Sequence, residues 1–250
     1  MNIIKKTDQD ALKSRVFNKR FINYNIYMGE RLKILRRKNY NFNEVLTDDS
    51  FCSKIIKMLR NFQMDQRGSV LMTKNDICDA LCHVANYFHI LYLNNINLES
   101  LNLRSNINES NVNSYIKKTF DYLCLSNVIS QSGGIVIASK TMHFIMPEIF
   151  IMIDNRVMKS LHNISDYYPK HNEPFEWYNE LINYEGQKLN PYQGTWNWSK
   201  YICYAGVLIY YKRIINEWCQ INNSNIKGFL KNDRLSAVPY ASRIIDKIFW

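Results

Sequence analysis

The polar side chains with the clearest chemical potential lie in an apolar stretch, residues 133–157, with the sequence GGIVIASKTMHFIMPEIFIMIDNRV. Its sparse charged or titratable groups include Lys140, His143, Asp154 and Arg156. A carboxylate can act as a general acid or base, and an amine can act as a nucleophile or bind phosphate. The rest of the sequence predicts only a basic, mostly helical protein, so the functional hypothesis starts from this stretch.

The spacing around Pro147 predicts how two of these groups meet. Residues 138–146 are expected to form a helix about 13 Å long, which Pro147 ends. Residues 148–153 cover at most about 20 Å when extended, which is enough to run back along that helix. The return segment can therefore bring Asp154 close to Lys140, at the start of the helix.

Asp154 is also well placed to begin a helix of its own. Aspartate is a preferred N-cap residue, and a short helix is expected over residues 155–162. The starts of two helices would then lie together, and helix N-termini bind phosphate through their free N–H groups. The Lys140 amine and the Asp154 carboxylate, fourteen residues apart in the sequence, would share the mouth of one pocket.

Three short motifs in this stretch resemble the helix-hairpin-helix DNA glycosylases. Proteins of that superfamily have a glycine-containing hairpin, a helix that often begins with Lys-Thr, an apolar return and an aspartate that opens a helix. The similar segments here are Gly133-Gly134, Ser139-Lys140-Thr141 and Ile153-Asp154-Asn155-Arg156-Val157. The resemblance is closest to bacterial proteins with an 8-oxoguanine DNA glycosylase-like fold, whose terminal helix is similar to residues 243–250.

The resemblance implies a hydrolase of DNA repair or defence that flips a base out of the duplex into a pocket. By this similarity Asp154 would be the catalytic acid residue that assists departure of the base. Lys140 would be a nucleophile or a phosphate contact, although it occupies the position of the family's post-hairpin lysine. The residues implied for substrate binding are Gly133, Gly134, Ser139, His143, Arg156, Trp196 and Trp198.

Each of these residues also has a purely structural interpretation. Asp154 can be a plain N-cap, and Lys140 can extend to solvent from the first helical turn. His143 can be a hydrogen-bonded core histidine, Arg156 can pair with Asp154 or Glu148, and the tryptophans can belong to the core. On this interpretation the chain is a non-catalytic nucleic-acid-binding protein, or a helical protein-interaction module with a basic face.

The net charge of +10 is concentrated near the N-terminus. Residues 1–38 contain eleven Lys and Arg against three acids, a net charge of +8. This concentration indicates an anionic partner, first of all DNA, or else a solvated basic face. A membrane partner is not expected, because the segment lacks a clear apolar face opposite its charges. The candidate nucleic-acid contacts are Lys19, Arg20, Arg36, Arg37 and Lys38.

Composition predicts one mainly α, multi-helix domain. Hydrophobic residues make up 46% of the 250 residues, enough for a sizeable core. The alternative is two helical lobes with a central cleft, a basic segment over residues 1–68 and a main body over 69–250. There is no signal-peptide pattern and no uncharged apolar run of about 18 residues, so we expect a cytoplasmic protein.

The six cysteines lack the spacing of a zinc site. Cys78 and Cys82 lie one helical turn apart beside His83, but a tetrahedral zinc needs four ligands and no second pair has ligand spacing. We therefore expect buried, reduced thiols, with no metal site and no cofactor.

Hydrophobic periodicity and capping residues predict the helices. One or two are expected over residues 8–38, with a break at Gly29. The longest, from Thr195 or Asn197 to about Gln220, is apolar nearly all round, which is typical of a central helix. Further helices are expected over 47–63, 73–93, 108–125, 174–184 and 236–250, with a polar loop over 221–235. Short strands are expected at 128–130, 134–137 and 149–153.

Overall fold

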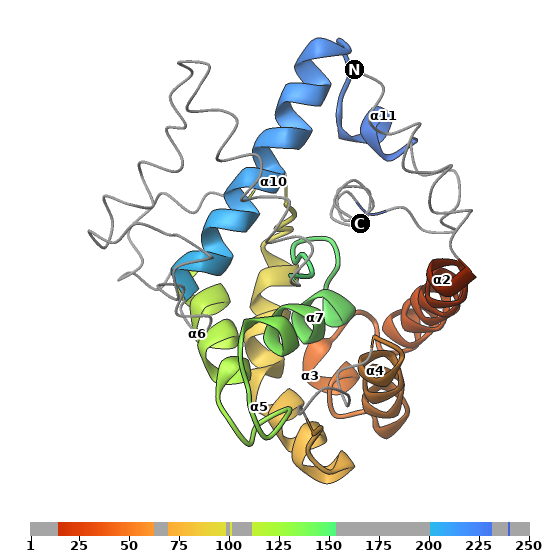
Figure 1. The fold of residues 1–250 in the computed structure, drawn as a ribbon, viewed down its shortest axis with the longest axis vertical. Helices are drawn as coiled ribbons and strands as arrows, with labels where there is room; N and C mark the ends of the chain where they lie inside the picture. The colour runs from red at the N-terminus through yellow and green to blue at the C-terminus, as the bar shows by residue number, and fades with distance from the viewer. Residues whose placement is uncertain are drawn as a thin grey trace.

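The computed structural model describes residues 15–62, 70–98, 101, 112–153, 201–231 and 240. Over these residues the fold is mainly α, as predicted, and no helix among them is long and apolar enough to cross a membrane. The helices are α2 (Arg15–Arg37), α3 (Phe42–Val45), α4 (Asp49–Asn61), α5 (Lys74–Leu93), α6 (Val112–Cys124), α7 (Ile135–Ile145), α10 (Tyr201–Ile221) and α11 (Ile226–Leu230) (Figure 1). The predicted boundary at residue 68 lies outside the described residues, so the two lobes and their cleft stay a prediction.

Two of the predicted helix starts are confirmed by their caps. The Asp48 carboxylate accepts hydrogen bonds from the first backbone N–H groups of α4. At α5 the Thr73 hydroxyl accepts from the Asp76 N–H, and the Asp76 carboxylate accepts from the Thr73 N–H, which completes a capping box. These caps depend on residues three positions apart, so the sequence alone locates them.

Helix α2 runs through Gly29 without the predicted break. Glycine costs only about 1 kcal/mol in a helix interior, and a Cβ at this position would meet nothing within 4 Å. Buried neighbours on both sides, such as Tyr24 and Leu35, hold the helix against the core and offset that cost. The helix ends where Asn39 and Tyr40 adopt a left-handed conformation, with φ of 49° and 56°.

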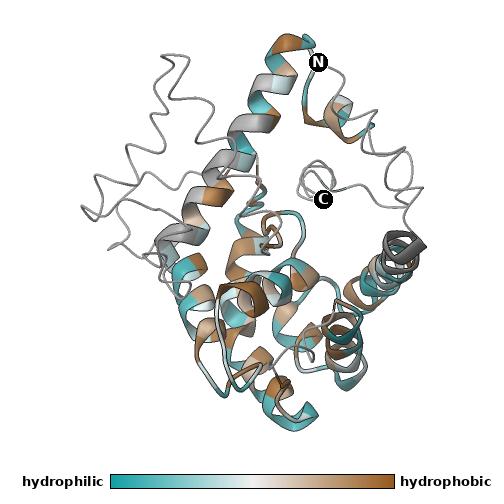
Figure 2. Cartoon of the chain, in the orientation of Figure 1, coloured by the Kyte–Doolittle hydropathy of each residue, from teal (hydrophilic) through white to brown (hydrophobic). Residues whose placement is uncertain are grey.

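Helix α7 is buried along nearly its whole length, and it contacts both α4 and α6. All of its residues except Val136 are buried, and Figure 2 shows it largely in the hydrophobic colour. The sequence predicted a central position for the helix that ends near residue 220. Over the described residues that helix, α10, contacts α6 and α11, and its Tyr204 bonds the segment after α7. Residues 221–235, predicted as a loop, include the short helix α11.

The predicted strand at 134–137 is wrong, because α7 begins at Ile135 rather than at residue 138. The β-branched run Ile-Val-Ile favours a strand in isolation, but here it lies in the first turn of a helix that is buried nearly all round. Of the other predicted strands, 128–130 contributes only an isolated bridge between Ser130 and Leu71. Residues 149–153 form no ladder with any described segment.

The prediction that all cysteines are reduced is wrong for one pair. Cys52 on α4 and Cys78 on α5 form a disulfide, with Cα atoms 5.8 Å apart. Cys82 and Cys124 are free thiols. Within the described residues no group of three or more Cys, His, Asp or Glu side chains is placed to hold a metal ion.

Candidate functional site

The turn before α7 depends on two consecutive glycines in conformations that other residues avoid. Gly133 has φ of +64° and Gly134 has φ of +103°. The Gly133 N–H donates to the Ser130 carbonyl and hydroxyl, and the Gly134 N–H donates to the Cys124 carbonyl at 2.8 Å. Both amides are therefore bonded within the protein. The N–H groups of the first turn of α7, residues 135–137, have no side-chain cap.

After Pro147 the chain turns and runs back along α7, as the sequence predicted. The N–H groups of Ile149 and Phe150 both point to the Met146 carbonyl, at 3.2 and 3.1 Å, which closes the turn. Six residues further along the chain from Pro147, the Ile153 N–H donates to the Ser139 hydroxyl at 3.0 Å. The predicted return is thus confirmed as far as Ile153.

Side chains, rather than a neighbouring strand, satisfy the backbone of this return segment. Tyr204 of α10 accepts from the Ile151 N–H at 3.3 Å and donates to the Ile151 carbonyl at 3.2 Å. The His143 ring bonds the Phe150 carbonyl at 2.7 Å. Every residue from 149 to 153 is buried, so these bonds satisfy groups that water does not reach.

Lys140 lies within the protein rather than at its surface. Its side chain is only 6% exposed, and its ammonium lies 5.6 Å from the centre of the Phe62 ring, at the end of α4. A cation over an aromatic face is stabilised by the ring quadrupole. The neighbouring Ser139 hydroxyl donates to the Val136 carbonyl at 3.2 Å while it accepts from Ile153. Ser139 thus bonds the end of the return segment, while the ammonium of its neighbour Lys140 lies against the end of α4.

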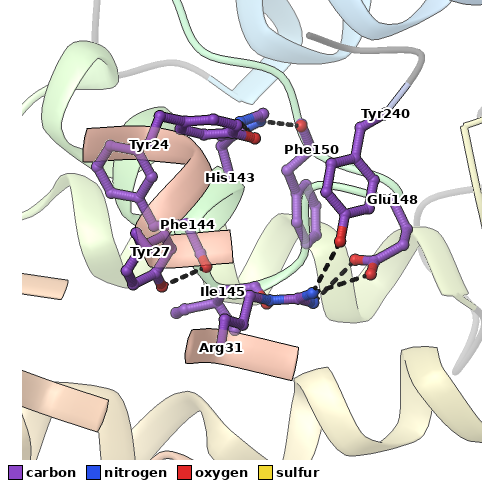
Figure 3. A network of polar contacts seen from close by, with 9 residues as sticks. All are labelled: Tyr24, Tyr27, Arg31, His143, Phe144, Ile145, Glu148, Phe150 and Tyr240. Carbon is purple, nitrogen blue, oxygen red and sulfur yellow. Dashed lines mark hydrogen bonds and ion pairs between the residues drawn. The ribbon is translucent and has the colours of Figure 1, made fainter. Parts of the chain in front are cut away.

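His143 is a buried core histidine, bonded through both ring nitrogens. Nδ1 faces the Phe150 carbonyl, an acceptor, so Nδ1 carries the proton. In the neutral ring Nε2 then accepts from the Tyr24 hydroxyl at 2.8 Å (Figure 3). This arrangement fixes the ring between α2 and the return segment.

A buried network joins α2 to the C-terminal end of α7 (Figure 3). The Tyr27 hydroxyl donates to the Phe144 carbonyl at 2.6 Å, and Arg31 Nε donates to the Ile145 carbonyl at 2.8 Å. The Arg31 guanidinium also forms a two-pronged ion pair with Glu148, at 3.0 and 3.1 Å. Arg31 is 1% exposed, whereas the Glu148 side chain is 39% exposed. The network satisfies two carbonyls at the helix end, which have no partner within the helix.

The same network shifts the ionisation of its members. Burial raises the pKa of Tyr240 to about 12 against the opposing effect of Arg31, whose guanidinium donates to its hydroxyl at 3.3 Å. Burial also raises the pKa of Tyr27 well above its ordinary value. Burial acts to lower the pKa of Arg31, but Glu148 and the two tyrosines keep it above its ordinary value.

Alkaline pH is expected to destabilise the protein through these two phenols. The folded-state pKa values exceed the ordinary value of about 10. The two protonated phenols therefore make their full contribution to the free energy of unfolding below pH 10. This contribution is lost as the pH rises toward the Tyr240 pKa of about 12. The loss is up to about 1.4 kcal/mol per pH unit for each phenol. Urea unfolding from pH 8 to 11.5 should show a smaller loss of unfolding free energy for Tyr27→Phe than for the wild type. Tyr92→Phe, at a partly exposed position, is the control, and equal losses in all three proteins would contradict the assignment.

The other predicted site residues fall into two groups. Asp154, Arg156, Trp196 and Trp198 lie outside the described residues, as do the side chains of Lys19 and Arg20. Arg36 and Arg37 occupy the last turn of α2, both exposed, and Lys38 follows partly buried. The Arg37 guanidinium donates to the Asp48 carboxylate at 2.7 Å, so this cation stabilises the start of α4 as well as facing solvent.

Sequence reasoning missed Arg31, because an arginine in a basic segment predicts a surface position. Its spacing does indicate a position on the buried face of the helix. Steps of three and four residues along one face connect Tyr24, Tyr27, Arg31 and Leu35. A charge on such an apolar stripe needs an ion-pair partner, which the partly exposed Glu148 supplies.

The first two turns of α7 form a neighbourhood with an uncapped helix start and a hydroxyl that holds the return segment, and a buried lysine follows that hydroxyl in the helix. Such a neighbourhood can bind an anion at the helix N-terminus and can position a carboxylate that follows the return. The Ser139 and Ile153 contact defines where that carboxylate would enter. Comparison with protein-family models, with curated proteins and with solved structures finds no match.

Proposed function

We propose that this chain binds DNA through the hairpin between α6 and α7 and removes a flipped base, with Asp154 as the catalytic acid residue. One observation carries the proposal, the hydrogen bond from the Ile153 N–H to the Ser139 hydroxyl at 3.0 Å. Asp154 follows Ile153 in the sequence. A carboxylate delivered to this point could stabilise the positive charge that develops on the sugar as the base leaves.

The start of α7 supports phosphate binding beside that carboxylate. The helix begins directly after Gly133 and Gly134, and no side chain caps it. The partial positive charge of a helix N-terminus attracts anions, and its first N–H groups point toward them. The net charge of +10 favours a polyanion as the partner. The two glycine amides are bonded internally, so the proposed phosphate contacts are the N–H groups of residues 135–137.

The burial of Lys140 changes the role that we propose for it. A buried lysine is rarely left without a carboxylate or another compensating partner. We propose that its ammonium holds the Asp154 carboxylate in place, rather than reaching a phosphate from the protein surface. The Phe62 ring, whose centre lies 5.6 Å from the ammonium, would restrict its movement.

A second candidate function is DNA binding without chemistry. The observation that favours it is the burial of His143, whose two ring nitrogens both bond protein groups. Together with the burial of Lys140, this leaves neither side chain at the protein surface to act on a bound base. The two candidates share the same DNA-binding surface and differ in what happens to the bound base.

The two candidates can be separated with the full-length chain and short duplexes that contain 8-oxoguanine, uracil or no lesion. We expect base release, detected as strand breaks after alkali, to fall at least about a hundredfold in Asp154→Asn, while DNA affinity is retained. Asp79→Asn, which changes an exposed carboxylate on α5, is the matched control. DNA affinity should also fall steeply as salt is increased.

Three outcomes are informative. Base release that depends on Asp154 but not on Asp79 supports the enzyme. Salt-dependent binding without base release from any of the duplexes supports the second candidate. No binding to any duplex at low salt would overturn both.

A further inference from the structure

The disulfide between Cys52 and Cys78 joins two helices that also pack against each other. Cys52 lies near the start of α4 and Cys78 near the start of α5, 26 positions apart in the sequence. Their Cα atoms are 5.8 Å apart, a distance at which the bond can form or break without movement of the backbone. Helix α4 also contacts α2 and α7, so this bond restrains an element on which much of the described fold depends.

The two cysteines differ in their exposure to solvent. Cys52 is 1% exposed, whereas Cys78 is partly exposed on the flank of α5. A small thiol or disulfide in solution can therefore reach Cys78 but not Cys52. Attack at one accessible sulfur, with the partner sulfur as the leaving or resolving group, is how thiol–disulfide exchange proceeds.

The reduced form would also fit the structure. The Cys52 sulfur lies 4.0 Å from the Lys74 carbonyl, which can accept the S–H group once the bond is broken. Phe51 and Ile55 on α4, together with Ile77 and Leu81 on α5, are fully buried. This apolar contact between the helices does not depend on the disulfide, so both redox states are compatible with the same packing.

We propose that Cys52 and Cys78 are a reversible redox pair that exchanges with small-molecule disulfides such as oxidised glutathione. In the oxidising direction the Cys78 thiolate attacks one sulfur of the small disulfide, forming a mixed disulfide and releasing one small thiol. The Cys52 thiolate then attacks the Cys78 sulfur and releases the second small thiol. Two electrons pass from the protein to the small disulfide, and the two protons from the protein thiols end on the two released thiols.

Cys82 lies one turn beyond Cys78 but takes no part in the proposed exchange. Cys82 is a free, exposed thiol, and partial burial together with the neighbouring Asp79 raises its pKa. Its S–H group donates to the Leu46 carbonyl at the end of α3, with the sulfur 3.8 Å from the oxygen. Cys82 therefore serves as an internal control.

The redox state is expected to change thermal stability. Closing a loop of this length in the unfolded chain is expected to raise the midpoint of unfolding by about 10 °C. Cys82→Ala should retain the full difference between the oxidised and reduced forms. Cys52→Ala/Cys78→Ala should unfold at the midpoint of the reduced wild type under both conditions.

The test uses the full chain equilibrated in glutathione buffers from fully reduced to fully oxidised, followed by alkylation and peptide mass spectrometry. We expect the Cys52 and Cys78 peptides to change together, in a two-electron transition, while the protein stays folded by circular dichroism. A pair that stays oxidised in excess reduced glutathione until the protein unfolds would overturn the proposal, as would a pair that never forms a disulfide. The alkylation of the wild-type chain tests the proposal even if the double variant fails to fold.

Discussion

Arg31→Met is expected to lower the free energy of unfolding by about 3 kcal/mol. Methionine has a similar length and keeps part of the apolar contact of the arginine stem. It supplies no donors, so it leaves the Ile145 carbonyl and the Glu148 carboxylate without their partner. Removal of one member of a buried ion pair costs about 3–5 kcal/mol. We expect the lower end of that range, because Glu148 is partly exposed and water can solvate it.

Arg36→Met is the matched control for this prediction. It makes the same substitution on the same helix, at an exposed position, where changes of about 0.5 kcal/mol or less are usual. Urea unfolding followed by circular dichroism would measure both variants. Equal stabilities for the two variants would show that the network around Arg31 contributes little to the fold.

Gly133→Ala is expected to destabilise the protein by about 3–4 kcal/mol. An alanine at φ of +64° costs about 1–2 kcal/mol because of its Cβ. That Cβ would also lie 2.3 Å from the Cys124 carbonyl oxygen, a backbone atom that cannot rotate away. Relief of the overlap must move the end of α6 relative to α7, which weakens the Gly134 hydrogen bond to the same carbonyl.

Two other glycines separate the causes of this effect. Gly134→Ala introduces strain at φ of +103° but meets nothing within 4 Å, so a smaller loss is expected. Gly29→Ala, inside α2 with open space around it, should stabilise the protein by up to about 1 kcal/mol. Thermal and urea unfolding of the three variants should therefore rank Gly29→Ala above Gly134→Ala, and Gly134→Ala above Gly133→Ala. A Gly133→Ala protein as stable as Gly134→Ala would rule out the backbone overlap as a cause.

The sequence predicted those features that depend on neighbouring residues. The caps at Asp48 and Thr73 follow from preferences that act within one turn. The end of α7 before Pro147 follows from the covalent geometry of proline. The return to Ser139 was predicted because helix length and extended reach are simple functions of residue count.

Features that depend on distant contacts were missed. The start of α7 looked like a strand, since Ile135 and Val136 are β-branched and tertiary burial decided against their local preference. Gly29 looked like a helix break, although packing of the flanking turns overrides its small cost. Cys52 and Cys78 have no local pattern that marks them as a pair. Arg31 depends on Glu148, more than a hundred positions away.

At the candidate site the same distinction holds. The approach of the return segment to Ser139 was predictable from length alone, whereas the orientation of Lys140 toward Phe62 was not. The end of α4 supplies that ring, and its position depends on how α4 packs against α7. The bonding of both glycine amides was likewise not predictable, because it depends on Ser130 in the preceding loop and on the Cys124 carbonyl at the end of α6.

The way in which the return segment is held has a consequence for insertions and deletions. A strand in a sheet can slip by two residues and recover equivalent bonds, because its neighbour offers a repeating ladder. Here three separate side chains, those of His143, Tyr204 and Ser139, each hold one defined residue of the segment. An added or deleted residue would displace all of these bonds at once, with no equivalent position to move to. The length between Pro147 and Ile153 is therefore as strongly constrained as the identity of any residue within it.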